Sequence, residues 1–181
     1  DLEAIQLASG QAVELANQLM NYGRGEKDED EAFDLTLRLR QLTTMLRVTL
    51  PPGITLTTQL PEGPLILKEN PFHLDQMLVN LVLNARDALP QGGSIEVTCT
   101  DDQPEKGPRM VRLEVRDDGT GMTEEVRAHL FEPFFTTKPS GHGTGIGLAS
   151  VKEALRGFRG RITVESEPGL GTRFIILLPL T

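Results

Sequence analysis

Three amide side chains recur at every fourth position of residues 75–89, DQMLVNLVLNARDAL. They are Gln76, Asn80 and Asn84, and most positions around them are apolar. Because steps of four residues drift by only about 40° around a helix, the amides form one polar stripe on an otherwise buried helix. Asparagine is a poor helix former, and its amide oxygen is a suitable ligand for Mg²⁺. The stripe indicates a magnesium site; hydrogen bonding to neighbouring backbone is the alternative use for the amides.

The second candidate is an aspartate at the end of a predicted strand, in VRDDGTGM, residues 115–122. Gly119 and Gly121 allow the backbone to come close to a ligand, so Asp117 could stand at the floor of a pocket and accept a hydrogen bond from an exocyclic amine. Asp-Gly turns are common, and this segment alone is weak evidence. The glycine turn in EPGLGTRF, residues 167–174, is likewise not diagnostic by itself.

The third candidate is the glycine-rich segment FFTTKPSGHGTGIGLA, residues 134–149. It matches neither the P-loop pattern, which needs a lysine after the glycines, nor the dinucleotide-binding pattern, which needs GxGxxG directly after a strand. It leads into a predicted helix whose first turn lies within GTGIGL, where free backbone N–H groups and the helix dipole favour an anion. A mobile surface loop without a ligand is the alternative interpretation.

Helices and strands, some of them paired as hairpins, are mixed along the part of the chain that must position these groups. We predict an α+β fold, a two-layer α/β sandwich with a mixed, mostly antiparallel sheet. Cys99 lies in a predicted strand, where a small core residue is expected rather than a reactive thiol. The predicted helices cover 34–48, 70–89, 123–130 and 146–158, and the predicted strands cover 54–60, 64–68, 94–100, 110–116, 161–166 and 172–179.

A long helix is predicted at the N-terminus, before the sandwich. Residues 2–22 lack proline and carry apolar or small residues at alternating spacings of three and four, which is typical of a heptad seam. Such a helix packs on a partner helix in the same protein or in a second copy; an amphipathic helix lying on its own domain is the alternative. The charged segment 25–33 is predicted to be a linker.

Composition excludes some classes of partner. The 181 residues carry a net charge of -8, only 4% aromatics and no Trp, which argues against nucleic-acid binding. We find no apolar run of about 18 residues and no export leader, so we expect no membrane contact by this segment and a cytoplasmic location, either free or as the cytoplasmic part of a membrane-bound parent. The first residue is Asp1 rather than Met, and we expect a piece of a longer protein.

In this order and at this spacing, the segments resemble the catalytic, ATP-binding domain of bacterial sensor histidine kinases, members of the GHKL superfamily with the Bergerat fold. Residues 75–89 resemble its N box, 131–138 its F box, and 117–121, 143–148 and 169–174 its three G boxes. The resemblance covers residues 34–181. Residues 1–24 resemble the second helix of the dimerisation and histidine-phosphotransfer hairpin, whose first helix, with the acceptor histidine, is absent from this chain.

The resemblance implies a role for each matching residue. Asp117 would receive the adenine amino group, with Gly121, Met122 and Thr172 around the ring. Asn84 would hold Mg²⁺ against the triphosphate, and Asn80 and Gln76 would be the catalytic candidates. Asp87 stands where many members of the family carry a basic residue that touches phosphate. A carboxylate cannot do this, so Asp87 is left outside the site, and Arg86 is a weak candidate to replace the missing basic residue. The resemblance also implies nucleotide contacts for a further set of residues: Asn80, Gly119, Phe131, Thr136, Thr137, Lys138, Gly143, Thr144, Gly145, Ile146, Gly147 and Leu148.

The implied function is that of a protein-histidine kinase, which transfers the γ-phosphate of ATP to a histidine for relay to a response-regulator aspartate. None of His73, His129 and His142 is placed like the family's acceptor, so the expected partner is an acceptor helix of the same or a sister subunit, followed by a receiver domain. Homodimerisation through residues 2–22 is one interpretation of the heptads. ATP hydrolases of the superfamily carry a glutamate in place of Asn80, and an amide cannot take a proton. The alternative is a catalytically idle nucleotide-sensing module.

Overall fold

The architecture follows from strands that alternate in burial and from three longer helices that each bury one face. The structure, a computed structural model, describes residues 30–102, 107–138 and 144–180. The predicted N-terminal helix over 2–22 and most of the predicted linker lie outside these residues. In the part of the chain that is described, no helix is both long enough and apolar enough to cross a membrane.

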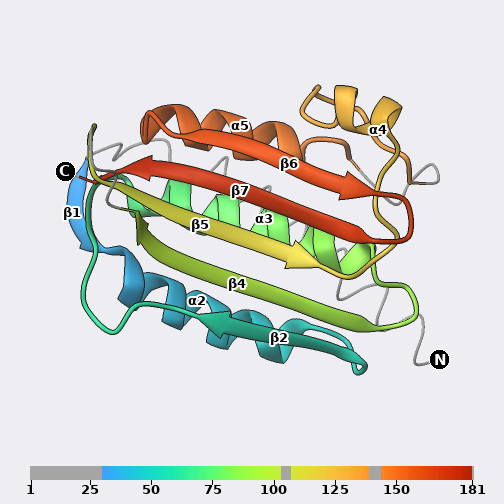
Figure 1. Cartoon of the computed structure of the whole chain (residues 1–181), viewed down its shortest axis with the longest axis horizontal. Coiled ribbons are helices and arrows are strands. Elements are labelled where there is room, and N and C mark those ends of the chain that lie inside the picture. Colours follow the sequence, from blue (N-terminus) through green and yellow to red (C-terminus); the bar gives the residue numbers. More distant parts are fainter. Residues whose placement is uncertain (1–29, 103–106, 139–143, 181) are drawn as a thin grey trace. The chain divides into compact units, whose positions relative to one another are not determined.

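Five strands form the main sheet, in the order β2-β4-β5-β7-β6 (Figure 1). The strands are β2 (Ile54–Gln59), β4 (Gly93–Asp102), β5 (Met110–Asp117), β6 (Arg161–Glu167) and β7 (Gly171–Pro179). β2 pairs with β4 in parallel, and the other pairings in this sheet are antiparallel. The predicted mixed, mostly antiparallel sheet is therefore confirmed.

Three helices cover one face of this sheet, and no helix of the described residues covers the opposite face (Figure 1). They are α2 (Leu35–Thr49), α3 (Pro71–Asp87) and α5 (Gly147–Gly157), with the short α4 (Glu124–His129) beside β6. Alternate residues of β4 and β5 point into the core between the two layers, among them Ile95, Val97 and Leu113, all fully buried. Cys99 is buried in the same row, as predicted, and burial raises the pKa of its thiol to about 12.

Two helices begin where local sequence signals place them. The Asp34 carboxylate accepts the N–H groups of Thr36 and Leu37 and so caps α2. Asn70 accepts the Phe72 N–H at 3.0 Å, and Pro71 occupies the first turn of α3, where its missing N–H costs nothing. The amide stripe is therefore carried on a helix with a fixed starting point.

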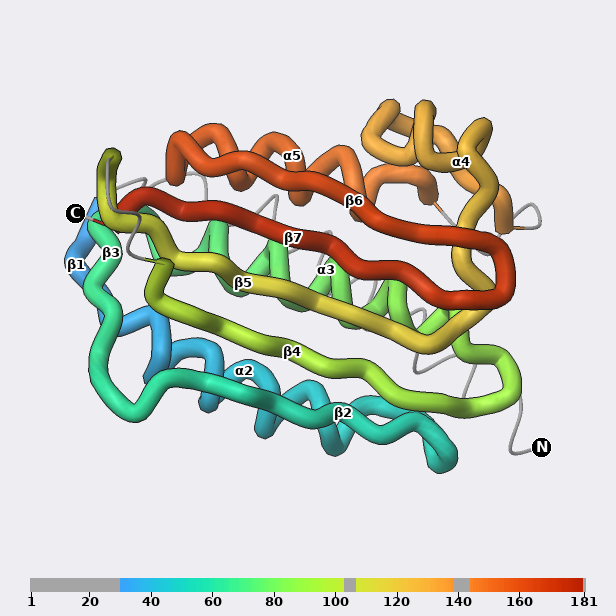
Figure 2. The backbone as a smooth tube through the Cα atoms, viewed as in Figure 1, coloured from blue at the N-terminus to red at the C-terminus, as the bar shows by residue number. Residues whose placement is uncertain are grey.

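The start of the domain differs from the prediction. Residues 31–33, assigned to the linker, form β1 (Glu31–Asp34), which pairs antiparallel with β3 (Ile66–Glu69) in a separate two-stranded sheet (Figure 2). The acidic composition predicted a solvated segment, but Phe33 packs against the core. Asp34 also accepts the Leu65 N–H at 3.3 Å, so its side chain joins this small sheet to the start of α2.

Candidate active site

The amide stripe of α3 is half-buried, as its period of four residues predicts. Gln76, Asn80 and Asn84 are each partly exposed, whereas Met77, Leu78 and Leu81 on the other side of the helix are fully buried. None of the three amides hydrogen bonds to another residue in the described ranges, so the backbone there does not satisfy them. Polar groups held at a partly buried surface without a protein partner are suited to binding a ligand.

The first turn of α5 lies against Asn80. A Cβ atom added to Gly147 would stand 3.7 Å from Asn80 Oδ1, which is ordinary contact distance. Ile146 is the N-cap of α5 and provides no side-chain cap. The first N–H groups of a helix have no partner within the helix, and the dipole places partial positive charge at the same end. An amide and a set of free N–H donors thus meet at one place.

The F box is joined to the second G box through the backbone. The Phe134 N–H donates to Gly145 O at 3.0 Å. Both residues have positive φ, 67° and 65°, and a Cβ on Gly145 would stand 2.4 Å from the Phe134 carbonyl carbon. Only glycine fits at 145 because the Phe134 backbone passes so close. Three threonines next to these segments, Thr136, Thr137 and Thr144, are exposed to solvent. Gly143 lies outside the described residues.

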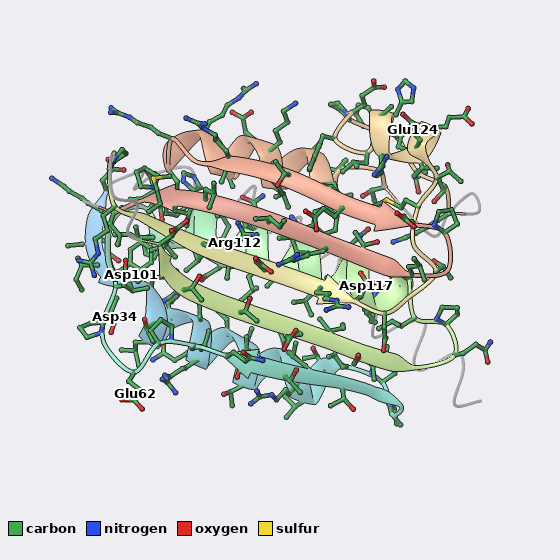
Figure 3. The ribbon with its side chains drawn as sticks, viewed as in Figure 1. Asp34, Glu62, Asp101, Arg112, Asp117 and Glu124 are labelled. Atoms are coloured by element: carbon green, nitrogen blue, oxygen red, sulfur yellow. The ribbon has the colours of Figure 1, made fainter. Side chains whose placement is uncertain are left out.

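Asp117 is the last residue of β5 (Figure 3). It is almost fully buried, with 3% of its surface exposed. Burial raises the pKa of its carboxyl, and hydrogen bonds from the backbone N–H groups of Gly119 and Thr172 oppose that shift. The Gly119 N–H lies 2.9 Å from Asp117 Oδ1. In the described part of the chain, no basic side chain pairs with this carboxylate.

The turn after Asp117 is packed too tightly for side chains at two positions. A Cβ on Gly119 would stand 2.3 Å from Ala88 O, and one on Gly121 would stand 1.9 Å from Glu167 O. Thr120 donates its N–H to Ala88 O at 3.0 Å, and the Ala88 N–H bonds to Asn84 O. The turn that carries Asp117 is thereby attached to the end of α3, one helical turn beyond Asn84.

Ser166 links the first and third G boxes, and sequence analysis did not identify it. Its buried hydroxyl oxygen accepts the Met122 N–H at 2.9 Å and lies 2.9 Å from Gly171 O and 3.1 Å from Thr172 Oγ1. Thr172 is itself opposite Asp117 in the β5–β7 register. A lone serine in an alternating strand gives no sequence signal that distinguishes it from a surface residue.

The remaining predicted site residues are placed as follows. Phe131 is half-buried, with Lys152 Nζ 5.8 Å from the centre of its ring, and Leu148 packs against the core. Lys138 forms an ion pair with Asp87, the residue that sequence analysis left outside the site. Two histidines face carboxylates: His73 lies 3.2 Å from Glu69, and His129 lies 2.8 Å from Glu132.

The comparison with known families decides the identity of this site. Residues 69–181 match the family described as histidine kinase-, DNA gyrase B- and HSP90-like ATPases. The chain belongs to this ATPase family. The predicted resemblance to sensor histidine kinases is thus confirmed, and ATP is the nucleotide that the family implies.

Its relatives are sensor kinases. Sensor kinase CckA of Brucella abortus (strain 2308) is 35% identical over 191 residues, which cover 99% of this chain and 20% of that protein. Sporulation kinase A of Bacillus subtilis (strain 168) is 33% identical over 127 residues, 70% of this chain and 20% of the relative. The chain therefore spans about a fifth of the length of these curated relatives.

Solved structures of the same family share the fold. The nucleotide-free catalytic domain of the histidine kinase ThkA superposes with a TM-score of 0.72 at 28% identity, covering 84% of this chain and 97% of that domain. The mycobacterial sensor histidine kinase MprB gives a TM-score of 0.69 at 25% identity, with 83% and 97% covered. The ATPase domain described here thus has the fold of histidine kinase catalytic domains.

Proposed function

We propose that this domain binds Mg·ATP between α3, the turn at 117–121 and the start of α5, and transfers the γ-phosphate to a histidine on a separate helix. Asp117 carries the proposal. A nearly buried carboxylate with no basic partner in the described chain costs stability, and an adenine amino group would supply the missing donor. Gly121, Met122 and Thr172 would surround the ring.

The phosphates would lie at the end of the site away from Asp117. Backbone N–H groups at and just before the start of α5, from Gly145, Gly147 and Leu148, are suited to phosphate oxygens. The Ile146 N–H donates to Thr144 Oγ1 at 3.4 Å and would exchange that bond for one to a phosphate. The amide oxygen of Asn84 is a ligand type that Mg²⁺ accepts, and Asn80 lies one turn away on the same face. When bound, Mg²⁺ would neutralise charge on the triphosphate.

The proposed chemistry is phosphoryl transfer rather than hydrolysis. A bond forms between phosphorus and an imidazole nitrogen while the bond from phosphorus to the bridging oxygen of ADP breaks. This reaction depends on positioning and charge neutralisation more than on covalent participation by the enzyme. Neither Asn80 nor Gln76 can take a proton from water, so neither amide can act as the general base of a hydrolase.

The partners proposed for the parent protein follow from this reaction. The acceptor histidine would lie on a helix of the same or a sister subunit, and the phosphoryl group would pass to an aspartate of a response-regulator receiver domain. Residues 2–22 would contribute to a homodimer through their heptads, and the domain would work in the cytoplasm.

Transfer is tested with labelled ATP, Mg²⁺, this chain and a separately produced histidine-bearing hairpin. We expect acid-labile, base-stable label on the hairpin and none on a hairpin in which the histidine is replaced by glutamine. Label on neither hairpin, together with normal binding of a nonhydrolysable ATP analogue, would favour a nucleotide-sensing module instead. Absence of nucleotide binding would contradict both functions.

A further inference from the structure

The carboxylate of Asp87 lies on the same face of α3 as the amide stripe. Asp87 lies seven positions after Asn80, which brings it to within about 20° of Asn80 around the helix axis. A negative charge on this face would repel a triphosphate. It therefore needs a compensating charge or a different role in the site.

Asp87 has two basic partners. Its Oδ2 pairs with Lys138 Nζ, and its Oδ1 lies 2.6 Å from a terminal guanidinium nitrogen of Arg86 and 2.8 Å from Arg86 Nε. Lys138 is 51 positions away in the chain, so this pair joins the end of the F box to the end of α3. One acid and two bases leave this group with a net positive charge.

Lys138 is held at both its backbone and its side chain. Its N–H donates to Thr136 Oγ1 at 3.1 Å, and its ammonium group contacts Asp87. The side chains of Lys138 and Asp87 are 35% and 27% exposed, so solvent screens the pair only in part. An unpaired lysine side chain samples many rotamers and loses this freedom when it binds a ligand. A lysine that is already held in one rotamer does not incur that entropic cost on binding.

We propose that Asp87 is a positioning residue that holds Lys138 beside the phosphate-facing side of α3, so that Lys138 provides the positive charge that position 87 lacks. This inference rests on the proposed ATP site. Asp87 acts through Lys138 and does not touch the nucleotide. A pair with only a structural role would affect unfolding and leave nucleotide affinity unchanged.

The test is a double-mutant cycle on the whole chain. The dissociation constant of a nonhydrolysable ATP analogue with Mg²⁺, and the KM and kcat of transfer to a histidine-bearing hairpin, are measured for Asp87→Ala, Lys138→Ala and the double variant. We expect each single variant to weaken binding about tenfold, mostly through KM, and the double variant to be no worse than Lys138→Ala. Asp87→Glu, which keeps the charge, should bind within about twofold of the wild type.

Glu153→Ala is the matched control, because Glu153 pairs with Arg156 at 2.7 Å on the exposed side of α5. It should leave affinity unchanged. Losses that multiply in the double variant, or an Asp87→Ala variant that binds as tightly as the wild type, would overturn the positioning role while leaving the proposed ATP site intact. A wild-type chain that binds no analogue would overturn both.

Discussion

Asp118 accepts two hydrogen bonds from Ser94, one from the backbone N–H to Oδ1 and one from the hydroxyl to Oδ2, each 2.7 Å long. Ser94 lies in β4, and Asp118 directly follows Asp117. The turn that carries Asp117 is thus attached to β4 on one side and, through Ala88, to α3 on the other. This double attachment fixes the carboxylate before any ligand binds.

Replacing Asp118 by alanine should lower the free energy of unfolding by about 1 kcal/mol at pH 7. The hydrogen bonds from Ser94, first from its backbone N–H, lower the pKa of Asp118 in the folded state. Its contribution is therefore present above the pKa of the unfolded state and disappears as pH falls through the folded-state pKa. Urea denaturation of both proteins at pH 7 and at pH 3 measures this, and an equal loss at both values would contradict it.

Asp117→Asn should have opposite effects on binding and on stability. The amide still accepts the Gly119 N–H but removes a buried charge, so unfolding at pH 7 should cost about 1 kcal/mol more than in the wild type. Because burial raises the folded-state pKa of Asp117, this difference should vanish as pH falls below the carboxyl range. Affinity for an ATP analogue should fall about 10- to 100-fold, since the adenine amine loses a charged acceptor. Calorimetry at pH 7 measures the affinity, and unchanged binding would exclude the adenine role.

Local signals in the sequence were sufficient to predict most helices and strands. Asn70 with Pro71, and Asp34, mark helix starts through contacts within three residues, so they can be read without tertiary structure. The strand at 31–34 could not be predicted this way, because it is stabilised by a partner strand more than thirty residues away. The parallel pairing of β2 with β4 is likewise non-local.

The same distinction applies to the site. Asn80 and Asn84 were found from their spacing on one helix, and Asp117 from the turn that follows it. The contact of Asn80 with Gly147 depends on how α3 and α5 pack, and periodicity does not encode it. The pairing of Asp87 with Lys138 could not be predicted, because the two residues lie in different segments of the chain.

Gly121 should tolerate no side chain. Its φ is +65°, and a Cβ would stand 1.9 Å from Glu167 O, so Gly121→Ala must displace backbone and should destabilise the domain by about 3 kcal/mol. Gly169→Ala has a similar φ of +80° but open space, and about 1 kcal/mol is expected. Gly63→Ala, with open space and no positive φ, should change stability by less than about 0.5 kcal/mol. Thermal or urea unfolding of the three variants measures this order, and equal effects would contradict the steric argument.

Asn84→Ala should remove the effect of Mg²⁺ on nucleotide binding without disturbing the fold. Asn84 is partly exposed and makes no side-chain hydrogen bond to another described residue, and alanine is the better helix former, so stability should stay equal or rise slightly. In the wild type, Mg²⁺ should tighten binding of an ATP analogue relative to EDTA; in the variant the two affinities should agree within about twofold, and transfer to a histidine should fall about 100-fold. Calorimetry with Mg²⁺ and with EDTA measures the affinities, and thermal unfolding followed by circular dichroism measures the stability of the variant. A variant that still binds more tightly with Mg²⁺ would show that Asn84 is not needed to hold the ion.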